Sequence, residues 1–271
     1  MSYEIKGFGC IPSDKDIRDY KLNAKLINAT LDNVPTSFKL TNLHVKSQGN
    51  KPTCTAHATS EIIEYCNQKE TGEYERFSTD FIYGLRDQYY DYQGPGMKIR
   101  DALKVAQDYG DVPYQDFPGN YDADIAKKNI ETKLESLKEE AYKNRISTYF
   151  RLKTPHEIKY ALYKYSNPII VGMWWPHNVK LSSGGILEHT DFVKDQAHAV
   201  IIVGYDSKYW LLQNSWGKSW GARGLFRVPI SETENLFFDI YGVTDNIENI
   251  KTPSKITKKL SSLINKFLNR K

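Results

Sequence analysis

The chain has 271 residues, of which 40% are hydrophobic and 26% are charged, and its formal net charge is +4. This composition is normal for a soluble globular protein, and 19 tyrosines and five tryptophans favour aromatic packing over disorder. No apolar run is long enough to span a membrane, and the first residues lack the apolar stretch of a secretory signal. Three cysteines exclude a multi-disulfide framework and indicate a reducing compartment. We therefore expect a cytoplasmic protein, or one packaged from the cytoplasm, for example in a virion.

The first half of the chain is predicted to be mainly helical. Residues 1–33 form an irregular arm that contains glycines and a charged run. A helix begins at Cys54, with an apolar stripe at Ala58, Ile62 and Cys66. A second helix covers residues 98–109, and a third, charged and solvated, covers 122–144.

The second half shows strand and turn signals. Short apolar or β-rich runs, separated by Gly, Asn, Asp and Ser, cover residues 168–175, 198–205, 209–213 and 224–228. Helices followed by strands predict an α+β fold of two lobes that meet at a cleft. We place the helical lobe at residues 34–150 and the β-rich lobe at 151–245.

The C-terminal tail, residues 246–271, has its own pattern. Its last 21 residues, 251–271, contain seven Lys or Arg and no acid, which leaves the rest of the chain slightly negative and gives it no basis for nucleic-acid binding. Apolar residues recur at helical spacing with lysines opposite, which predicts a basic amphipathic helix that docks on an anionic membrane surface or an acidic partner. Packing on its own domain, or disorder, fits equally well.

Cys54 is the candidate nucleophile. A cysteine thiol is mostly protonated at neutral pH, and a helix N-terminus or a nearby imidazolium lowers its pKa. Cys54 opens a predicted helix after a polar loop, whereas Cys66 lies on the apolar stripe, where a buried, inert thiol is expected. His57, one turn after Cys54, is expected to pack or to face solvent.

His198 is the candidate base, at the start of a predicted buried strand. Alone, such a histidine is more often structural. The segment 212–221 changes this, because Asn214 can accept a hydrogen bond from the imidazole nitrogen that faces away from sulfur. Trp216 would keep water from that bond. His44, His156, His177 and His189 carry no such pattern.

Four motifs, in order and spacing, resemble those of the papain and cathepsin family of cysteine peptidases, particularly its short bacterial and viral members. They are Val34-Pro35-Thr36-Ser37, the loop from Gln48 to Cys54, His198-Ala199-Val200 with Val203-Gly204-Tyr205, and Asn214-Ser215-Trp216-Gly217 with Trp220-Gly221. The resemblance covers residues 34–245. It implies a papain-like two-lobed fold with the active site in the cleft.

The resemblance also implies roles for the residues. Cys54 attacks the peptide carbonyl, His198 transfers the proton, Asn214 orients His198, and Gln48 with the Cys54 N–H forms the oxyanion hole. The expected function is that of an endopeptidase that acts on polypeptides as a monomer and needs no cofactor or metal. A catalytically silent binding module and another acyl-transfer enzyme, an amidase or a transglutaminase, are the alternatives.

Departures from the family pattern affect the surroundings of the nucleophile. Lys51 stands where familiar members have a disulfide-bonded cysteine, Thr55 where they have Trp, and Ala197 where several have Asp. None removes a catalytic atom.

The resemblance also places a substrate pocket around Gly96, Met97, Gly172 and Ala199, with a base near residues 239–241, where an acid would admit basic side chains. The arm either lies over the cleft and limits access, as in a zymogen, or braces the lobes. Cys10, within the arm, is expected to be an unpaired surface thiol.

Overall fold

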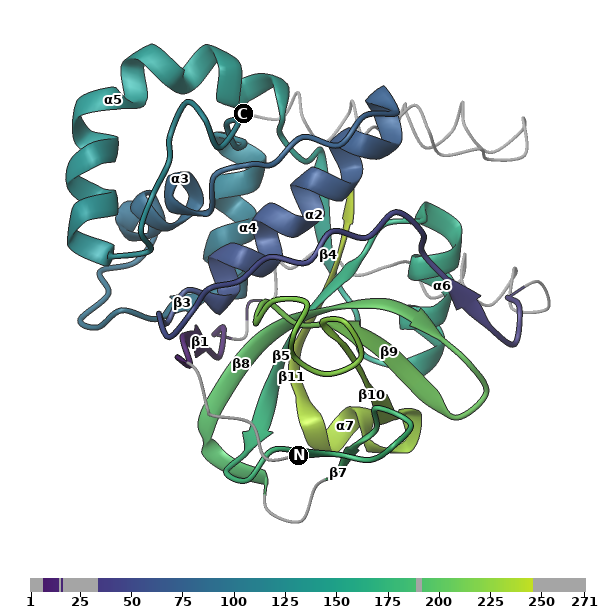
Figure 1. The fold of residues 1–271 in the computed structure, drawn as a ribbon. Helices are drawn as coiled ribbons and strands as arrows, with labels where there is room; N and C mark the ends of the chain where they lie inside the picture. The colour runs from purple at the N-terminus through teal and green to yellow at the C-terminus, as the bar shows by residue number, and fades with distance from the viewer. Residues whose placement is uncertain (1–6, 15, 17–33, 189–191, 246–271) are drawn as a thin grey trace.

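The computed structural model describes residues 7–14, 16, 34–188 and 192–245. Helices occupy one part of the described structure and an antiparallel sheet the other (Figure 1), which confirms the predicted α+β class. The expectations for the tail, for most of the arm and for His189 fall outside the described residues. None of the helices in the described ranges is long and apolar enough to cross a membrane.

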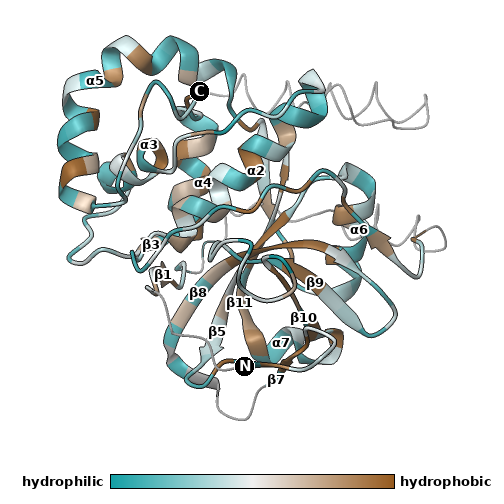
Figure 2. Cartoon of the chain, in the orientation of Figure 1, coloured by the Kyte–Doolittle hydropathy of each residue, from teal (hydrophilic) through white to brown (hydrophobic). Residues whose placement is uncertain are grey.

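The helical part is built around α2, which is the helix predicted to begin at Cys54. Its other members are α3, α4, α5 and a short 3₁₀ turn, η2. Their bounds are α2 Cys54–Thr71, α3 Thr79–Gly84, η2 Arg86–Gln88, α4 Ile99–Asp108 and α5 Ala123–Lys143. Gly72 caps the C-terminal end of α2, and its φ of 82° is in the left-handed region that glycine adopts freely. α5 buries few of its residues, as predicted for a solvated helix, and Figure 2 shows that most of its residues are hydrophilic.

The β-rich part contains one seven-stranded antiparallel sheet. Six strands follow the order β10-β9-β8-β5-β11-β4, and β2 pairs with the end of β8. The bounds are β2 Phe38–Lys39, β4 Thr148–Arg151, β5 Ile169–Pro176, β8 Phe192–Tyr205, β9 Tyr209–Gln213, β10 Leu225–Pro229 and β11 Phe237–Thr244. Helix α6 (Pro155–Tyr165), the turn η3 (Ile230–Glu232) and α7 (Thr233–Leu236) complete this part, with the small hairpin β6 (Lys180–Leu181) and β7 (Leu187–Glu188). The four predicted strands are present, and β8 begins six residues earlier than predicted.

Local sequence signals explain several of these boundaries. Thr154 and Glu157 form a reciprocal capping box at the start of α6, and Pro155 occupies its first turn. Asp122 caps α5 by accepting a hydrogen bond from the backbone of Ile125. β5 lies between β8 and β11 and is also contacted by helices α2, α4 and α6, and seven of its eight residues are buried, which explains its continuous apolar run.

Helices α2 and α4 both contact the sheet, and two of the contacts between the helical part and the sheet lie around the start of α2. Helix α2 packs against β8, which brings the start of the helix close to the strand that carries His198. The loop before α2 also pairs with the loop after β9: the Gln48 N–H donates to the Ser215 carbonyl (2.8 Å) and the Gly217 N–H donates to the Lys46 carbonyl (2.9 Å).

Lys46 anchors the loop before α2 to the helical part. Its ammonium is buried and lies 2.8 Å from the Glu64 carboxylate, and it also donates to Ser60 and to the Phe77 carbonyl. The Glu61 carboxyl accepts the Lys46 N–H, and burial raises the pKa of Glu61 to about 8. Lys46 is therefore the positive centre of a buried polar network.

We predict that Lys46→Met lowers the free energy of unfolding by about 3–5 kcal/mol, because it leaves the Glu64 carboxylate buried without its cation. Glu64→Gln added to that variant removes the charge but keeps the acceptor for the Phe77 N–H, and should recover part of the loss. Urea denaturation measures both. Lys128→Met, at an exposed position of α5, serves as the control and should change stability by less than about 0.5 kcal/mol. Equal losses in the single and double variants would contradict the network.

Candidate active site

Cys54 is the first residue of α2 and is fully buried. The N–H groups in the first turn of a helix have no intrahelical acceptor, and the helix dipole is positive at this end. Both effects favour a thiolate at this position once it is hydrated. The structure confirms the sequence prediction that a helix begins at Cys54.

His198 lies in β8, and Asn214 follows β9, the next strand of the sheet. The structure brings the two side chains together, with 2.8 Å between His198 Nε2 and Asn214 Oδ1. Both residues are fully buried. Because an amide oxygen only accepts, the proton of this hydrogen bond lies on Nε2, which leaves Nδ1 of the neutral ring as an acceptor. Nδ1 has no hydrogen-bond partner among the described residues.

Aromatic rings enclose the imidazole. Trp216 lies with its ring centroid 4.9 Å from that of His198, as expected for a residue that shields the hydrogen bond. Trp175, at the end of β5, lies at the same distance in an edge-on orientation. Phe8, from the arm, approaches edge-on at 5.9 Å. These rings exclude water from His198.

Gln48 is held by both halves of the molecule. Its side-chain oxygen accepts a hydrogen bond from the Ser215 hydroxyl (2.7 Å), which fixes the orientation of the amide. Its Nε2 then donates to the Lys51 carbonyl (2.6 Å) and to the Gly7 carbonyl of the arm (2.8 Å). The donor predicted for an oxyanion hole is thus already bound to a carbonyl oxygen of the same chain.

The arm lies over Cys54 and pairs with the edge of the helical part. Strand β1 (Cys10–Ile11) runs parallel to β3 (Met97–Lys98), and the Met97 N–H donates to the Gly9 carbonyl (2.8 Å). Only glycine fits at position 9, since a Cβ there would lie 1.8 Å from the Pro52 carbonyl oxygen. Farther along, the Ser13 N–H donates to Asp239 (2.7 Å) and Asp14 pairs with Lys98 (2.7 Å).

The residues predicted to form the substrate pocket lie beneath this arm. A Cβ on Gly96 would contact Ile11, and a Cβ on Gly172 would lie 3.2 Å from the Cys10 sulfur. Met97 pairs with Cys10 across β1 and β3, and Ala199 pairs with Gly172 across β8 and β5.

The prediction that Cys10 is a surface thiol is wrong. Its residue is only 6% exposed, because β1 inserts between β3 and the sheet. Cys10, Cys54 and Cys66 are all free thiols, and Cys66 is buried on α2 as predicted.

Burial acts in opposite directions on the two reactive groups. It raises the pKa of the Cys54 thiol above its ordinary value, although hydrogen bonds from the backbones of Ala199 and Gly9 partly oppose this. Burial lowers the pKa of His198 to about 4, with the Asn214 hydrogen bond opposing it. Both groups are therefore neutral at pH 7 while the arm is in place.

The other candidate ligands and bases do not join this site. His57 is buried one turn along α2, its Nδ1 lies 3.0 Å from the Thr53 carbonyl oxygen, and burial lowers its pKa to about 3. His44 stacks on Tyr74. Within the ranges that the structure describes, no group of three or more His, Cys, Asp or Glu could hold a metal ion.

Sequence reasoning missed two residues that position the site. Ser215 orients Gln48, and it lies inside the Asn214-Ser215-Trp216-Gly217 motif, so its place beside Asn214 was a usable signal. Trp175 forms the second wall of the imidazole pocket but lies 23 residues before His198 in an apolar run, where nothing separates it from an ordinary core residue.

Comparison with known proteins agrees with this geometry. A family model described as papain family cysteine protease matches residues 34–242. Vignain of Ricinus communis is 26% identical over 240 residues, which cover 79% of this chain and 60% of vignain. The matched parts span 60% or less of the lengths of the first curated relatives.

Solved structures share the fold. Xylellain, a cysteine protease from Xylella fastidiosa, has a TM-score of 0.73 at 24% identity, covering 89% of this chain and 97% of that one. The cysteine protease CMS1MS2 of Carica candamarcensis, solved in complex with E-64, has a TM-score of 0.57 at 20% identity, covering 79% of this chain and all of that one. These likenesses confirm the predicted papain-like fold.

We predict that alkylation of Cys54 by iodoacetamide in the full chain is slow at pH 6–7 and rises about tenfold per pH unit up to roughly pH 9, because only the thiolate reacts and its pKa is raised. Mass spectrometry of the Cys54 peptide measures the rate, and Cys66 in the same sample is the internal reference for a buried thiol. Fast alkylation that is independent of pH between 5 and 8 would show that the thiolate already exists beneath the arm.

Proposed function

Because the chain belongs to the papain family of cysteine proteases, we propose that it is an endopeptidase that hydrolyses polypeptides through Cys54. The observation that carries the proposal is the 2.8 Å contact between His198 Nε2 and Asn214 Oδ1, which leaves Nδ1 available to the thiol. Gln48 supplies an oriented donor beside them.

The proposed reaction begins when the arm leaves and water enters the cleft. Hydration moves the pKa of Cys54 down and that of His198 up, so the proton passes from sulfur to Nδ1. The thiolate then attacks the substrate carbonyl carbon, and the C=O electrons move onto an oxygen that Gln48 Nε2 and the Cys54 N–H stabilise. One such donor typically contributes about 10²–10³ in rate.

Collapse of this intermediate breaks the C–N bond, and His198 gives its proton to the departing amine. The acyl group remains on sulfur as a thioester. Water attacks the thioester with His198 as general base, and breakage of the C–S bond releases the carboxylic acid and restores the thiolate–imidazolium pair. Throughout, Asn214 holds the ring in one orientation, and Trp216 with Trp175 keeps water from the Nε2 bond.

Two other functions fit less well. A silent binding module would not need a nucleophile, base and amide donor to be retained together, as Cys54, His198 and Gln48 are. An amidase or transglutaminase more often orients its histidine with aspartate, whereas Asn214 does so here. Unlike aspartate, an asparagine has no carboxylate that competes for the imidazole proton.

The substrate pocket favours an apolar side chain. Phe238 lies against Gly172 and closes one side, with Trp174 packed on it at 4.6 Å between ring centroids. Asp239, which could attract a basic side chain, is buried and already paired with Arg151 at 3.0 Å. Basic selectivity at this position would require that pair to open.

We also propose that residues 7–14 limit access to the cleft until they are displaced or removed. Three contacts support this: Gly7 binds the Gln48 amide, Phe8 packs on His198 and Trp216, and β1 pairs with β3 above the predicted pocket. The same contacts would let the arm brace the two halves, so the test must measure activity and stability together.

We predict that an epoxysuccinyl inhibitor labels Cys54 under reducing conditions at pH 5–7, rapidly in a chain lacking residues 2–33 and slowly in the full chain, and that Cys54→Ala abolishes both labelling and peptide hydrolysis. Intact-protein mass spectrometry detects the adduct. Cys66→Ala is the matched control, because that thiol is buried away from the cleft, and it should keep both. The peptidase proposal fails if neither the full chain nor a chain lacking residues 2–33 is labelled.

Gly9→Ala tests the arm with one methyl group. A Cβ at position 9 collides with Pro52, so the arm should leave the cleft and kcat/KM for a short fluorogenic peptide should rise on the order of tenfold. Gly94→Ala is the matched control, since a Cβ there has nothing within 4 Å.

Thermal unfolding of both variants separates the two roles of the arm. Higher activity with a modest loss of stability supports occlusion. The inhibitory role is rejected, and the bracing role supported, if the Gly9→Ala protein is folded but its activity is unchanged or lower. A chain lacking residues 2–33 must then behave in the same way.

A further inference from the structure

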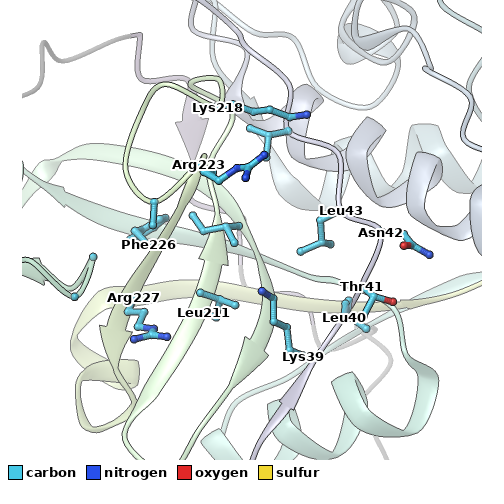
Figure 3. A pocket seen from close by; sticks show the side chains of 15 residues that line it. Lys39, Leu40, Thr41, Asn42, Leu43, Leu211, Lys218, Arg223, Phe226 and Arg227 are labelled. Atoms are coloured by element: carbon cyan, nitrogen blue, oxygen red, sulfur yellow. The ribbon is translucent and has the colours of Figure 1, made fainter.

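A second concave site lies on the sheet-rich part, outside the catalytic centre. This basic groove has a volume of about 730 Å³ and is bounded by the segment 39–45, β9, β10, the turn at 184–185 and the loop 218–224. Figure 3 shows apolar side chains, among them Leu211 and Phe226, between basic ones. It has no part in the mechanism above.

Among the described residues, four cations line the groove and no acid does; the cations are Lys39, Lys218, Arg223 and Arg227. All four are exposed, and within the described parts of the chain none forms an ion pair. Asp206 interacts with Arg227 electrostatically, but its carboxylate accepts the backbone N–H groups of Lys208 and Tyr209. The positive potential of the groove is therefore largely uncompensated.

The backbone at Arg223 is unusual. Its φ is +60°, a left-handed conformation that favours glycine or asparagine over a long side chain. The neighbouring Gly221 and Gly224 also have positive φ, so the turn has glycines at the other left-handed positions and arginine at this one. A residue kept in a strained conformation at the rim of a cavity indicates a role for its side chain.

One loop belongs to both the groove and the catalytic centre. It supplies Asn214 and Trp216 to the imidazole and Lys218 and Arg223 to the groove. Backbone hydrogen bonds from Asn214 to Gly224 (2.9 Å) and from Gly224 to Trp220 (2.7 Å) close the loop. A chain held in the groove is thus tethered beside the loop that also supplies Asn214, which raises its effective concentration near the catalytic centre.

We propose that the basic groove is an exosite for an acidic, extended segment of the polypeptide substrate. In Figure 3, Lys218 and Arg223 lie toward one end and Lys39 and Arg227 toward the other, with apolar residues between them. Acidic residues of a peptide pair with the ends, and an apolar side chain between them covers Leu211 and Leu225, which are both half-buried.

This arrangement favours a peptide over a phosphate group, which would be bound by cations that converge on one point. It also disfavours the chain's own C-terminal residues 251–271, whose seven basic residues and lack of acids would be repelled. The proposal rests on the proposed peptidase function, but binding to the groove can be measured without catalysis.

The first experiment measures binding to the full chain carrying Cys54→Ala. The probe is a fluorescein-labelled peptide of alternating Glu and Leu, and its partner has Gln in place of Glu. The acidic peptide should bind at least about fivefold more tightly than the neutral one, and this preference should shrink as NaCl rises from about 0.05 to 0.5 M.

Lys218→Ala with Arg223→Asn should abolish the preference, since asparagine tolerates the left-handed backbone and leaves the turn intact. Lys128→Ala with Lys133→Ala removes two exposed charges from α5 and is the control, which should keep the preference. Equal binding of both peptides, or equal loss in both double variants, overturns the proposal. The proposal is also overturned if ATP or inorganic phosphate displaces the acidic peptide at a lower concentration than the neutral peptide does, and if this displacement depends on Lys218 and Arg223. The site would then be one for phosphate.

The second experiment uses active chain and two fluorogenic substrates with one cleavable sequence, followed by a flexible linker and either the acidic or the neutral tail. The acidic tail should raise kcat/KM about three- to tenfold through a lower KM, and only the groove variant should lose this ratio. If the two substrates have equal kcat/KM although the acidic peptide binds tightly, the exosite role is rejected. Absence of hydrolysis of either substrate rejects the peptidase function and leaves the binding result as the test of the groove.

Discussion

The site depends on a short antiparallel contact between residues 46–48 and 215–217. Two backbone hydrogen bonds and the Ser215–Gln48 side-chain bond join a loop of the helical part to a loop of the sheet. Cys54 and Gln48 come from one side of this contact, and Asn214 from the other. The ion pair between Lys46 and Glu64 of α2 fixes the position of residues 46–48. Without this contact, α2 and β8 could pack together and still leave the oxyanion donor and the imidazole wrongly placed.

In the proposed regulation, the arm couples access to ionisation. Desolvation is the largest cause of the pKa shift at both Cys54 and His198, and it opposes the charged form of each. Phe8 contributes to that desolvation directly, because its ring covers His198. A segment that merely blocked the cleft would leave the ion pair formed beneath it. In this proposal, the segment that fills the cleft also keeps the nucleophile in its unreactive state, so its removal changes two properties at once.

The parts of the molecule that the sequence predicts are those with a local signal. Helical periodicity after Cys54, the apolar run of β5 and the spacing of the His198 and Asn214 motifs lie within short windows. β1 and β3 are two-residue strands 87 positions apart, so no periodicity or turn chemistry reveals their pairing. Cys10 was misplaced for that reason, since its burial depends wholly on the pairing. Trp175 was missed because an apolar strand does not show which of its residues faces a histidine.

In the proposed exosite arrangement, the loop 214–224 links the basic groove to the catalytic residues. Its glycines at 217, 221 and 224 adopt positive φ, which lets the chain reverse tightly enough to present Trp216 to one side and Lys218 with Arg223 to the other. Hydrogen bonds across the loop make it stiff, so a ligand in the groove is held at a fixed offset from the imidazole. Stiffness matters because a tether helps catalysis only when the bound chain can reach the cleft without further ordering. As proposed, the groove therefore needs no conformational signal to act on the site, because its position beside the same stiff loop is enough.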